Sequence, residues 1–269
     1  MTTQALAPPS AAAPPVNYEQ YFVPAIGLPV AKALIRVAAL RPGERVLDVG
    51  CGTGVAARLA AAQVGPDGSV AGLDPNPGML AVAGAAAPAE LGIEWHQAGA
   101  EAMPLPDGAF DVVLCQMALQ FMPDRGQALR EMRRVLAEGG RLALTVPGPA
   151  GPPFEILDRA MARHLGNQAA GFVRTVFALH DGGELERLLT DAGFRDVAVT
   201  AETHEFQLPA PADFLRQYIW STPLAAIVSE ASEDARSALE REVVAAWEEF
   251  GDGVGMRYRQ RAVTATARR

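Results

Sequence analysis

Short apolar runs alternate with helical patterns through the first half of the chain. Five apolar or alternating runs predict strands, at residues 46–49, 69–74, 93–97, 110–116 and 141–146. Between these runs, apolar residues recur every three or four positions and predict helices at 30–40, 55–60 and 125–136. Strands that alternate with helices in this way predict an α/β fold built on a parallel sheet.

The alternation breaks at the Pro- and Gly-rich residues 147–153, and helical patterns then predominate. A strand is predicted at 194–201 and a last one at 256–267. We expect a single domain at 17–269, in the following parts: a core of residues 41–146, 181–201 and 254–269, a helical N-terminal lid at 17–40, and helical cap insertions at 147–180 and 202–253. Residues 1–16 are rich in Ala and Pro and predict a disordered tail.

Composition narrows the class of protein. The 269 residues carry a net charge of −8, which disfavours a nucleic-acid substrate because phosphate binding needs a basic face. The two cysteines, Cys51 and Cys115, do not suggest a disulfide framework, and no metal-ligand spacing of Cys or His occurs. We find no apolar run of membrane-spanning length and no signal-peptide pattern, so we expect a cytoplasmic protein without membrane insertion.

The stretch V-L-D-V-G-C-G-T-G at 46–54 carries the clearest chemistry, because a buried strand runs there into a glycine-rich turn. Glycines permit a positive φ and let a ligand approach the backbone closely. A dinucleotide fingerprint would need a third glycine at position 55, where Val55 stands. A phosphate-binding P-loop would need a lysine, which is absent from the turn.

This stretch resembles the first motif of class I S-adenosylmethionine (SAM)-dependent methyltransferases, especially the ubiquinone/menaquinone-biosynthesis type. The turn L-A-E-G-G-R-L at 136–142 is also similar to that family. The resemblance implies a Rossmann-like, seven-stranded, mostly parallel sheet whose last strand is antiparallel, with SAM as cofactor. It implies that the following residues bind or orient the cofactor: Asp48, Gly50, Cys51, Gly52 and Gly54.

A second SAM element is expected at Asp74, which ends a strand 20 residues beyond Gly54. A carboxylate in that place accepts hydrogen bonds from ribose hydroxyls. A helix N-cap is the alternative role for it. The segment 74–80 is similar to the family's second SAM motif, which implies that Met79 lies near the adenine and that Pro75 also belongs to the cofactor site.

The segment 98–107 resembles the family pattern G-D-A-E-A-L-P-F-P, with one departure. Gly99 stands where the family has an Asp that binds the adenine amino group. The resemblance then implies that Ala100 and Glu101 face the adenine, or that an acceptor from elsewhere replaces the missing acid. We expect Gln116 on the pocket floor, because ligands bind beyond the carboxyl ends of parallel strands.

Methyl transfer from a sulfonium mainly requires positioning of the two reactants, which can contribute roughly 7–11 kcal/mol of barrier lowering. A general base is needed only when the nucleophile arrives protonated. The candidates are His180, Tyr18 and Tyr21, and none is marked by a motif. For each, a surface or packing role is the alternative, and Tyr21 could also touch the methionine end of SAM.

The predicted caps contain many aromatic residues, among them Phe154, Phe214 and Tyr218. They form either the caps' own core or the wall of a pocket for a small apolar or aromatic acceptor. The stripe that includes Tyr218 could instead be a homodimer surface. Three other functions stay open: a SAM-binding protein with a regulatory or cyclisation role, a nicotinamide-dependent oxidoreductase, and methylation of a protein substrate.

Overall fold

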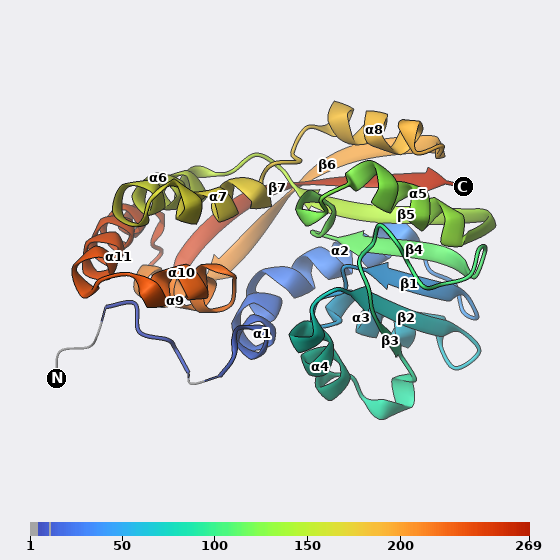
Figure 1. The fold of residues 1–269 in the computed structure, drawn as a ribbon, viewed down its shortest axis with the longest axis horizontal. Coiled ribbons are helices and arrows are strands. Elements are labelled where there is room, and N and C mark those ends of the chain that lie inside the picture. Colours follow the sequence, from blue (N-terminus) through green and yellow to red (C-terminus); the bar gives the residue numbers. More distant parts are fainter. Residues whose placement is uncertain (1–4, 11) are drawn as a thin grey trace. The chain divides into compact units, whose positions relative to one another are not determined.

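The computed structural model describes residues 5–10 and 12–269 (Figure 1). The strands are β1 Arg45–Val49, β2 Ser69–Asp74, β3 Glu94–Gln97, β4 Phe110–Gln116, β5 Leu136–Pro147, β6 Arg195–Leu208 and β7 Met256–Arg268. The helices are α1 Pro14–Asn17, η1 Tyr18–Gly27, α2 Leu28–Ala38, α3 Val55–Val64, α4 Pro77–Ala86, η2 Ala89–Leu91, η3 Leu119–Phe121, α5 Arg125–Val135, α6 Pro152–Leu165, α7 Asn167–Val176, α8 Gly182–Asp191, α9 Pro211–Trp220, α10 Leu224–Glu230, α11 Glu233–Trp247 and η4 Glu248–Phe250. Of these, η1 is a π-helix, and η2, η3 and η4 are 3₁₀ turns.

All seven strands form one sheet in the order β3-β2-β1-β4-β5-β7-β6. Strands β1 to β5 pair in parallel, and β7 runs antiparallel to β5. The predicted seven-stranded, mostly parallel α/β sheet with an antiparallel last strand is therefore confirmed. Strand β5 begins at Leu136, earlier than the predicted residue 141, because Leu136 pairs with Phe110 before the register shifts.

Successive side chains of the strands point to opposite faces of the sheet and belong to two apolar layers, one on each face. On one face Val46 and Val112 pack with apolar residues of α2 and α3. On the other face Leu47 and Val113 pack with apolar residues of α5 and α8. Because side chains alternate along a strand, a strand that is apolar throughout can serve both layers at once. Both α5 and α8 have an aspartate N-cap: Asp124 accepts the N–H of Gln127 in the first turn of α5, and Asp181 accepts that of Glu184 in the first turn of α8.

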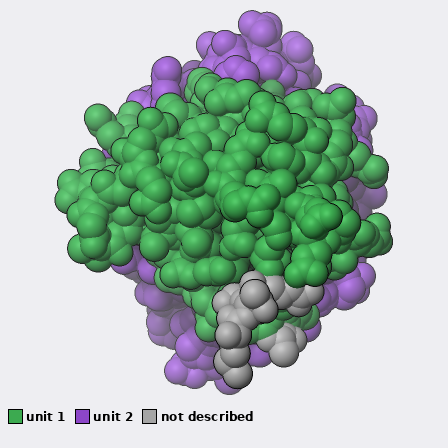
Figure 2. Space-filling model, turned by 90° about the vertical axis from the view of Figure 1, so that its left-hand side faces the viewer, with its two compact units in different colours: residues 1–26, 149–178, 203–260 green, residues 27–148, 179–202, 261–269 purple. Residues whose placement is uncertain are grey.

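The chain is divided into two compact units (Figure 2). Unit 1 comprises residues 1–26, 149–178 and 203–260, and unit 2 comprises residues 27–148, 179–202 and 261–269. The expected cap insertions, 147–180 and 202–253, cover most of the second and third segments of unit 1. The expected lid, 17–40, is divided between the two units. Assignment of all these parts to a single domain stays a prediction.

Unit 1 has an aromatic core. The ring of Phe154 lies 5.1 Å from Phe177, 5.2 Å from Tyr218 and 5.3 Å from Tyr258, measured between centroids. All four side chains are buried. These contacts favour the first of the two roles considered for the cap aromatics, in which they form the caps' own core.

The disordered tail expected at residues 1–16 is wrong for part of that range. Leu6 is fully buried, its N–H donates to the Glu240 carboxylate at 3.1 Å, and its carbonyl accepts from Trp220 Nε1 at 2.8 Å. Helix α1 begins at Pro14. Residues 1–4 and 11 lie outside the described residues. An Ala/Pro-rich composition disfavours local structure, but these contacts with distant residues hold the segment in place.

One helical stretch, Pro14–Ala38, is long and apolar enough to cross a membrane by length and composition alone. The sequence pattern does not predict it, because charged residues such as Glu19 and Lys32 interrupt the apolar run. Half of its most apolar window is buried within the protein. In its second half, Leu34, Ile35 and Ala38 of α2 belong to one of the two apolar layers.

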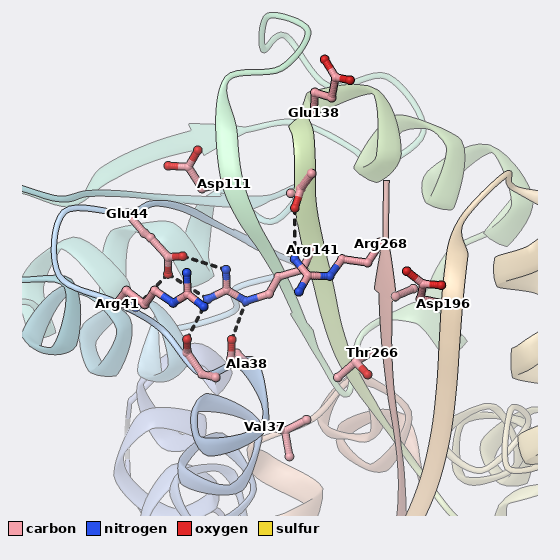
Figure 3. A pocket seen from close by; sticks show the side chains of 14 residues that line it. Val37, Ala38, Arg41, Glu44, Asp111, Glu138, Arg141, Asp196, Thr266 and Arg268 are labelled. Carbon is pink, nitrogen blue, oxygen red and sulfur yellow. Dashed lines mark hydrogen bonds and ion pairs between the residues drawn. The ribbon is translucent and has the colours of Figure 1, made fainter.

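A pocket of about 450 Å³ lies in unit 2 at the amino-terminal edge of the parallel strands (Figure 3). It is lined by charged residues of both signs, including Arg41, Glu44, Asp111, Arg141 and Arg268. The sequence analysis did not anticipate it. Most of these charges already have partners in the protein, as the contacts of Arg141 illustrate.

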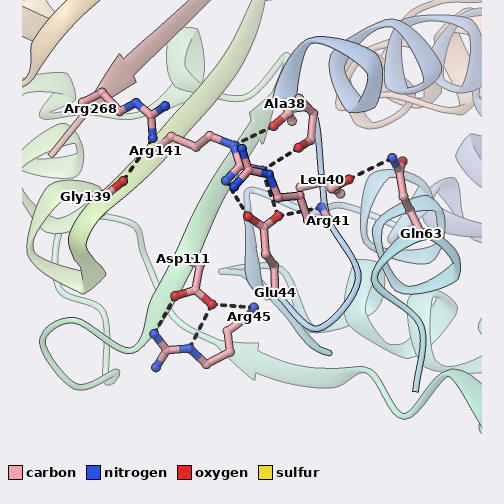
Figure 4. Close-up of polar contacts among 11 residues, drawn as sticks. Ala38, Leu40, Arg41, Glu44, Arg45, Gln63, Asp111, Gly139, Arg141 and Arg268 are labelled. Carbon is pink, nitrogen blue, oxygen red and sulfur yellow. Dashed lines mark hydrogen bonds and ion pairs between the residues drawn. The ribbon is translucent and has the colours of Figure 1, made fainter. Parts of the chain in front are cut away.

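Arg141 joins three parts of unit 2 (Figure 4). Its guanidinium binds both carboxylate oxygens of Glu44, at 2.7 and 2.8 Å, and donates to the carbonyls of Ala38 and Ala39 at the end of α2. Those carbonyls have no partner within the helix. This ion pair holds the pKa of Glu44 below its usual value. Arg141 therefore fastens α2 to β5 and to the turn before β1.

We expect Arg141→Lys to lower the free energy of unfolding by about 1–3 kcal/mol, because an ammonium cannot reproduce the forked contacts. Urea unfolding measures the change. Arg45→Lys is the matched control, since its pair with Asp111 is more exposed, at 45% and 35% against 18% and 14% for Arg141 and Glu44. The control should lose less than about 1 kcal/mol. Equal losses in the two variants would contradict this role of Arg141.

Candidate active site

The glycine turn after β1 is fastened to the end of β2. The N–H groups of Gly50 and Cys51 both donate to the carbonyl of Leu73, at 2.7 and 3.1 Å. The N–H of Gly52 donates to Asp74 Oδ2 at 2.9 Å. The turn and the acid that were predicted separately from the sequence therefore form one hydrogen-bonded unit at the carboxyl edge of the sheet.

The three glycines of the turn have different roles. All have positive φ, at +68° for Gly50, +53° for Gly52 and +81° for Gly54. A Cβ at Gly50 would lie 2.5 Å from Ala118 Cβ, and one at Gly54 would lie 2.5 Å from the Trp95 ring. A Cβ at Gly52 would meet nothing within 4 Å. Gly50 and Gly54 thus permit close packing, whereas Gly52 leaves the turn open on one side.

Asp48 lies beneath the turn and positions α3. Its Oδ2 accepts the N–H of Ala57 at 3.0 Å, which satisfies one of the free amides in the first turn of that helix. The carboxyl is buried, and burial raises its pKa to about 7, with a smaller contribution from the charge of Asp74. Its Oδ1 receives no hydrogen bond from any described residue.

Asp74 uses both carboxylate oxygens to order the backbone. Oδ2 accepts from Gly52, and Oδ1 accepts from the N–H of Asn76 at 2.9 Å. Burial raises the pKa of this carboxyl. The alternative role as a helix N-cap is wrong, because Asn76 caps α4 by accepting the amides of Gly78 and Met79. Each Asp74 oxygen still has a lone pair for a ligand.

The backbone is strained just beyond β4. Met117 has φ +50°, a left-handed conformation that non-glycine residues rarely adopt, and its N–H donates to the Thr145 carbonyl at 2.6 Å. Gln116 donates through Nε2 to the Gly27 carbonyl at 2.8 Å, and Gln120 donates likewise to the Met117 carbonyl at 2.9 Å. Such strain often accompanies functional sites.

Several buried side-chain oxygens at this carboxyl edge accept no hydrogen bond from the described residues. Five of them lie in or next to the turn, the loop after β3 and the end of β4: Asp48 Oδ1, Thr53 Oγ1, Glu101 Oε1, Gln116 Oε1 and Gln120 Oε1. Buried polar atoms are usually hydrogen-bonded, so such a cluster suits a ligand rich in donors. Thr53 and Gln120 were missed by the sequence analysis. Position within the glycine motif is a signal for Thr53, but no local signal distinguishes Gln120.

The remaining predicted residues are more dispersed. In unit 2, Pro75 is exposed, Met79 is half-buried, Ala100 is buried, and His180 is exposed just before the cap of α8. Tyr18 and Tyr21 belong to η1 in unit 1, where Tyr18 stacks on Phe22 at 4.7 Å. Catalytic roles for His180 and the two tyrosines stay predictions. Within residues 5–10 and 12–269, no group of three His, Cys, Asp or Glu residues is arranged to hold a metal.

Comparison with known proteins identifies the family. Residues 47–144 match the family described as Methyltransferase domain. Nocamycin O-methyltransferase from Saccharothrix syringae is 32% identical, over 80% of this chain and 82% of that protein. The chain belongs to the methyltransferase family. It is a SAM-dependent enzyme, and the alternative of a nicotinamide-dependent oxidoreductase is therefore wrong.

Other known proteins share part of the sequence or the fold of this chain. The ubiquinone/menaquinone biosynthesis C-methyltransferase UbiE of Stenotrophomonas maltophilia is 42% identical, but over 40% of this chain and 44% of that protein. Phosphoethanolamine N-methyltransferase 2 of Haemonchus contortus, solved with S-adenosylhomocysteine, has a TM-score of 0.60 and 19% identity over 95% of this chain and 56% of that one. The (4+2)-cyclase SpnF has a TM-score of 0.55 and 21% identity over 90% of this chain and 80% of that one.

The donor groups of SAM fit the cluster of buried oxygens in this methyltransferase. SAM carries an ammonium group, two ribose hydroxyls and an adenine amine, all of which donate hydrogen bonds. The unpartnered atoms of Asp48, Glu101, Gln116 and Gln120 are acceptors in the conformations found here. The carboxylates also suit the positive charge of the ligand.

Two glycine substitutions should distinguish effects on stability from effects on SAM affinity. Gly54→Ala introduces both strain and overlap with Trp95, so we expect the free energy of unfolding to fall by about 2–4 kcal/mol. Gly52→Ala introduces strain alone and should cost about 1–2 kcal/mol. We nevertheless expect Gly52→Ala to weaken SAM binding at least 10-fold, measured by calorimetry on folded protein. Unchanged affinity in Gly52→Ala would contradict close approach of SAM at this residue.

The raised pKa of Asp48 predicts a pH-dependent stability. Between about pH 4 and 7 the native carboxyl keeps its proton while the unfolded one ionises, so stability falls as pH rises through this window. The contribution amounts to at most about 4 kcal/mol at pH 7 and above. Asp48→Asn should therefore gain stability relative to the wild type as pH rises from 4 to 7, measured by urea unfolding. A constant difference between the two proteins over that range would refute the prediction.

Proposed function

We propose that this enzyme transfers the methyl group of SAM to an oxygen, nitrogen or carbon atom of a small, apolar or aromatic molecule. The observation that carries the proposal is the extent of similarity to nocamycin O-methyltransferase. That alignment spans 232 residues, whereas the shared methyltransferase domain spans residues 47–144. The similarity therefore extends beyond the part of the chain that we expect to bind SAM. It includes segments that we expect to determine which acceptor binds.

In this proposal, residues at the carboxyl ends of β1, β2 and β4 in unit 2 bind different parts of the cofactor. We assign the ribose hydroxyls to Asp74, whose two oxygens are already oriented by backbone amides. The open side of Gly52 accommodates the chain between ribose and sulfur. Asp48 and Gln116 each offer a buried oxygen to the ammonium group. When bound, SAM supplies a methyl group on a positively charged sulfur, which is a strong electrophile.

Positioning is then the main catalytic task of the protein. The turn is held by backbone hydrogen bonds, so it need not reorganise during the reaction. Holding the nucleophile in line with the methyl group can lower the barrier by roughly 7–11 kcal/mol. His180, Tyr18 and Tyr21 stay candidates for a base where the nucleophile arrives protonated. A cytoplasmic location, a homodimer and the absence of a nucleic-acid partner likewise stay predictions.

A second function deserves a test because SpnF shares the fold. Its similarity to this chain, 21% identity, concerns the fold alone. A protein that binds SAM without consuming it would give no labelled product from methyl-labelled SAM with any pool of small phenols, quinols or carboxylic acids. Tight SAM binding without transfer would therefore favour the regulatory or cyclisation role over the proposed one.

Asp74→Ala tests the ribose assignment. We expect SAM affinity to fall about 10- to 100-fold, since a charged acceptor of hydrogen bonds is lost. The same change frees two backbone amides and should also lower stability by about 1–3 kcal/mol. Ser232→Ala is the matched control, because it removes an acceptor of a backbone amide at the start of α11 in unit 1. Comparable affinities of the two folded variants for SAM, by calorimetry, would overturn the assignment.

A further inference from the structure

The side chain of Glu101 occupies the place that the missing acid at position 99 leaves open. A Cβ built on Gly99 would lie 3.1 Å from Glu101 Oε2. The carboxylate of Glu101 therefore folds back over the glycine, where any larger residue would crowd it. Its other oxygen, Oε1, is buried and receives no hydrogen bond within the described residues.

The register of the sheet places the loop that contains Glu101 at the same edge as Asp74. Gln97, the last residue of β3, pairs with Asp74, the last residue of β2. The loop that follows β3 begins at this edge, and Glu101 lies four residues beyond Gln97. A nucleoside whose ribose binds Asp74 can extend its base along this edge toward Glu101.

The loop is held in position by contacts with α5. The backbone carbonyl of Glu101 accepts from Gln127 Nε2 at 3.2 Å. Two residues later, the N–H of Met103 donates to Glu131 Oε2 at 2.9 Å, and Arg134 in turn binds that carboxylate. Glu101 makes no ion pair with the described residues, so its charge is available to a ligand.

We propose that the Glu101 carboxylate accepts a hydrogen bond from the exocyclic amine of the SAM purine and makes the enzyme select a 6-amino over a 6-oxo base. The inference rests on the proposed placement of the ribose at Asp74. A 6-oxo purine presents a carbonyl oxygen instead of an N–H donor, so lone pairs would face each other in a buried place. Sites built to bind a donor reject analogues that lack it, because the buried partner is left unpaired.

Binding measurements with two product analogues test this selectivity without requiring any acceptor. The probes are S-adenosylhomocysteine and its deaminated form, S-inosylhomocysteine, each titrated by calorimetry. The wild type should prefer the amino form at least 30-fold. Glu101→Gln should reduce the preference to less than 3-fold, since a rotated amide can donate to the oxo group and accept from the amine.

Two further variants guard against a merely structural effect. Gly99→Asp combined with Glu101→Ala should restore at least a 10-fold preference, because the acid returns from the neighbouring position. Glu90→Ala, which removes an exposed acid elsewhere, should keep the wild-type ratio. Since each ratio compares two ligands on one protein, partial unfolding cancels from it.

The outcomes separate this inference from the proposed function. A wild type without preference, or a Glu101→Gln variant that keeps the full preference, overturns the role of Glu101. Loss of methyl transfer alone leaves the binding ratios unaffected and bears only on the proposed reaction. Weakened binding of both analogues by the same factor in Glu101→Gln would show that the residue supports the loop and does not read the base.

Discussion

The structure of the site depends on the hydrogen bonds that tie the glycine turn to the end of β2. Two successive amides converge on one carbonyl, that of Leu73, and a third reaches the adjacent side chain of Asp74. Such convergence requires left-handed backbone at Gly50 and Gly52, which L-residues with a Cβ rarely adopt. The glycine spacing and the position of the acid are therefore two parts of one constraint, so a change in either loosens the contact between the turn and β2.

Sequence patterns predict those features that depend on residues close together in the chain. The caps at Asp124 and Asp181 follow from short polar side chains before amphipathic segments, and both are present. The antiparallel direction of the last strand was expected from the family resemblance, since periodicity alone does not assign strand directions. The burial of Leu6 could not be predicted, because its partners Trp220 and Glu240 lie more than 200 residues away. Tertiary contacts override local composition in such cases.

In the candidate site, too, some residues were predicted from local sequence and others depend on tertiary contacts. The motif located Asp48 and Asp74, whose backbone contacts span short distances in sequence or adjacent strands. It did not reveal which atoms would lack partners, because that depends on side-chain directions across several loops. Gln116 is oriented by its hydrogen bond to the carbonyl of Gly27, and the Glu101 carboxylate lies close to Gly99, where a side chain would crowd it. Such relations become visible only when the whole edge of the sheet is assembled.

The sheet order also constrains how the chain can fold during synthesis. Strand β7, at Met256–Arg268, lies between β5 and β6, although it is the last strand to leave the ribosome. Until it arrives, β5 remains an edge with unpaired backbone groups, and β6 has no neighbour on its inner side. Exposed edges of this kind can pair with other chains and seed aggregation. The thirteen residues of β7 therefore cover two exposed strand edges in the same step that completes the sheet.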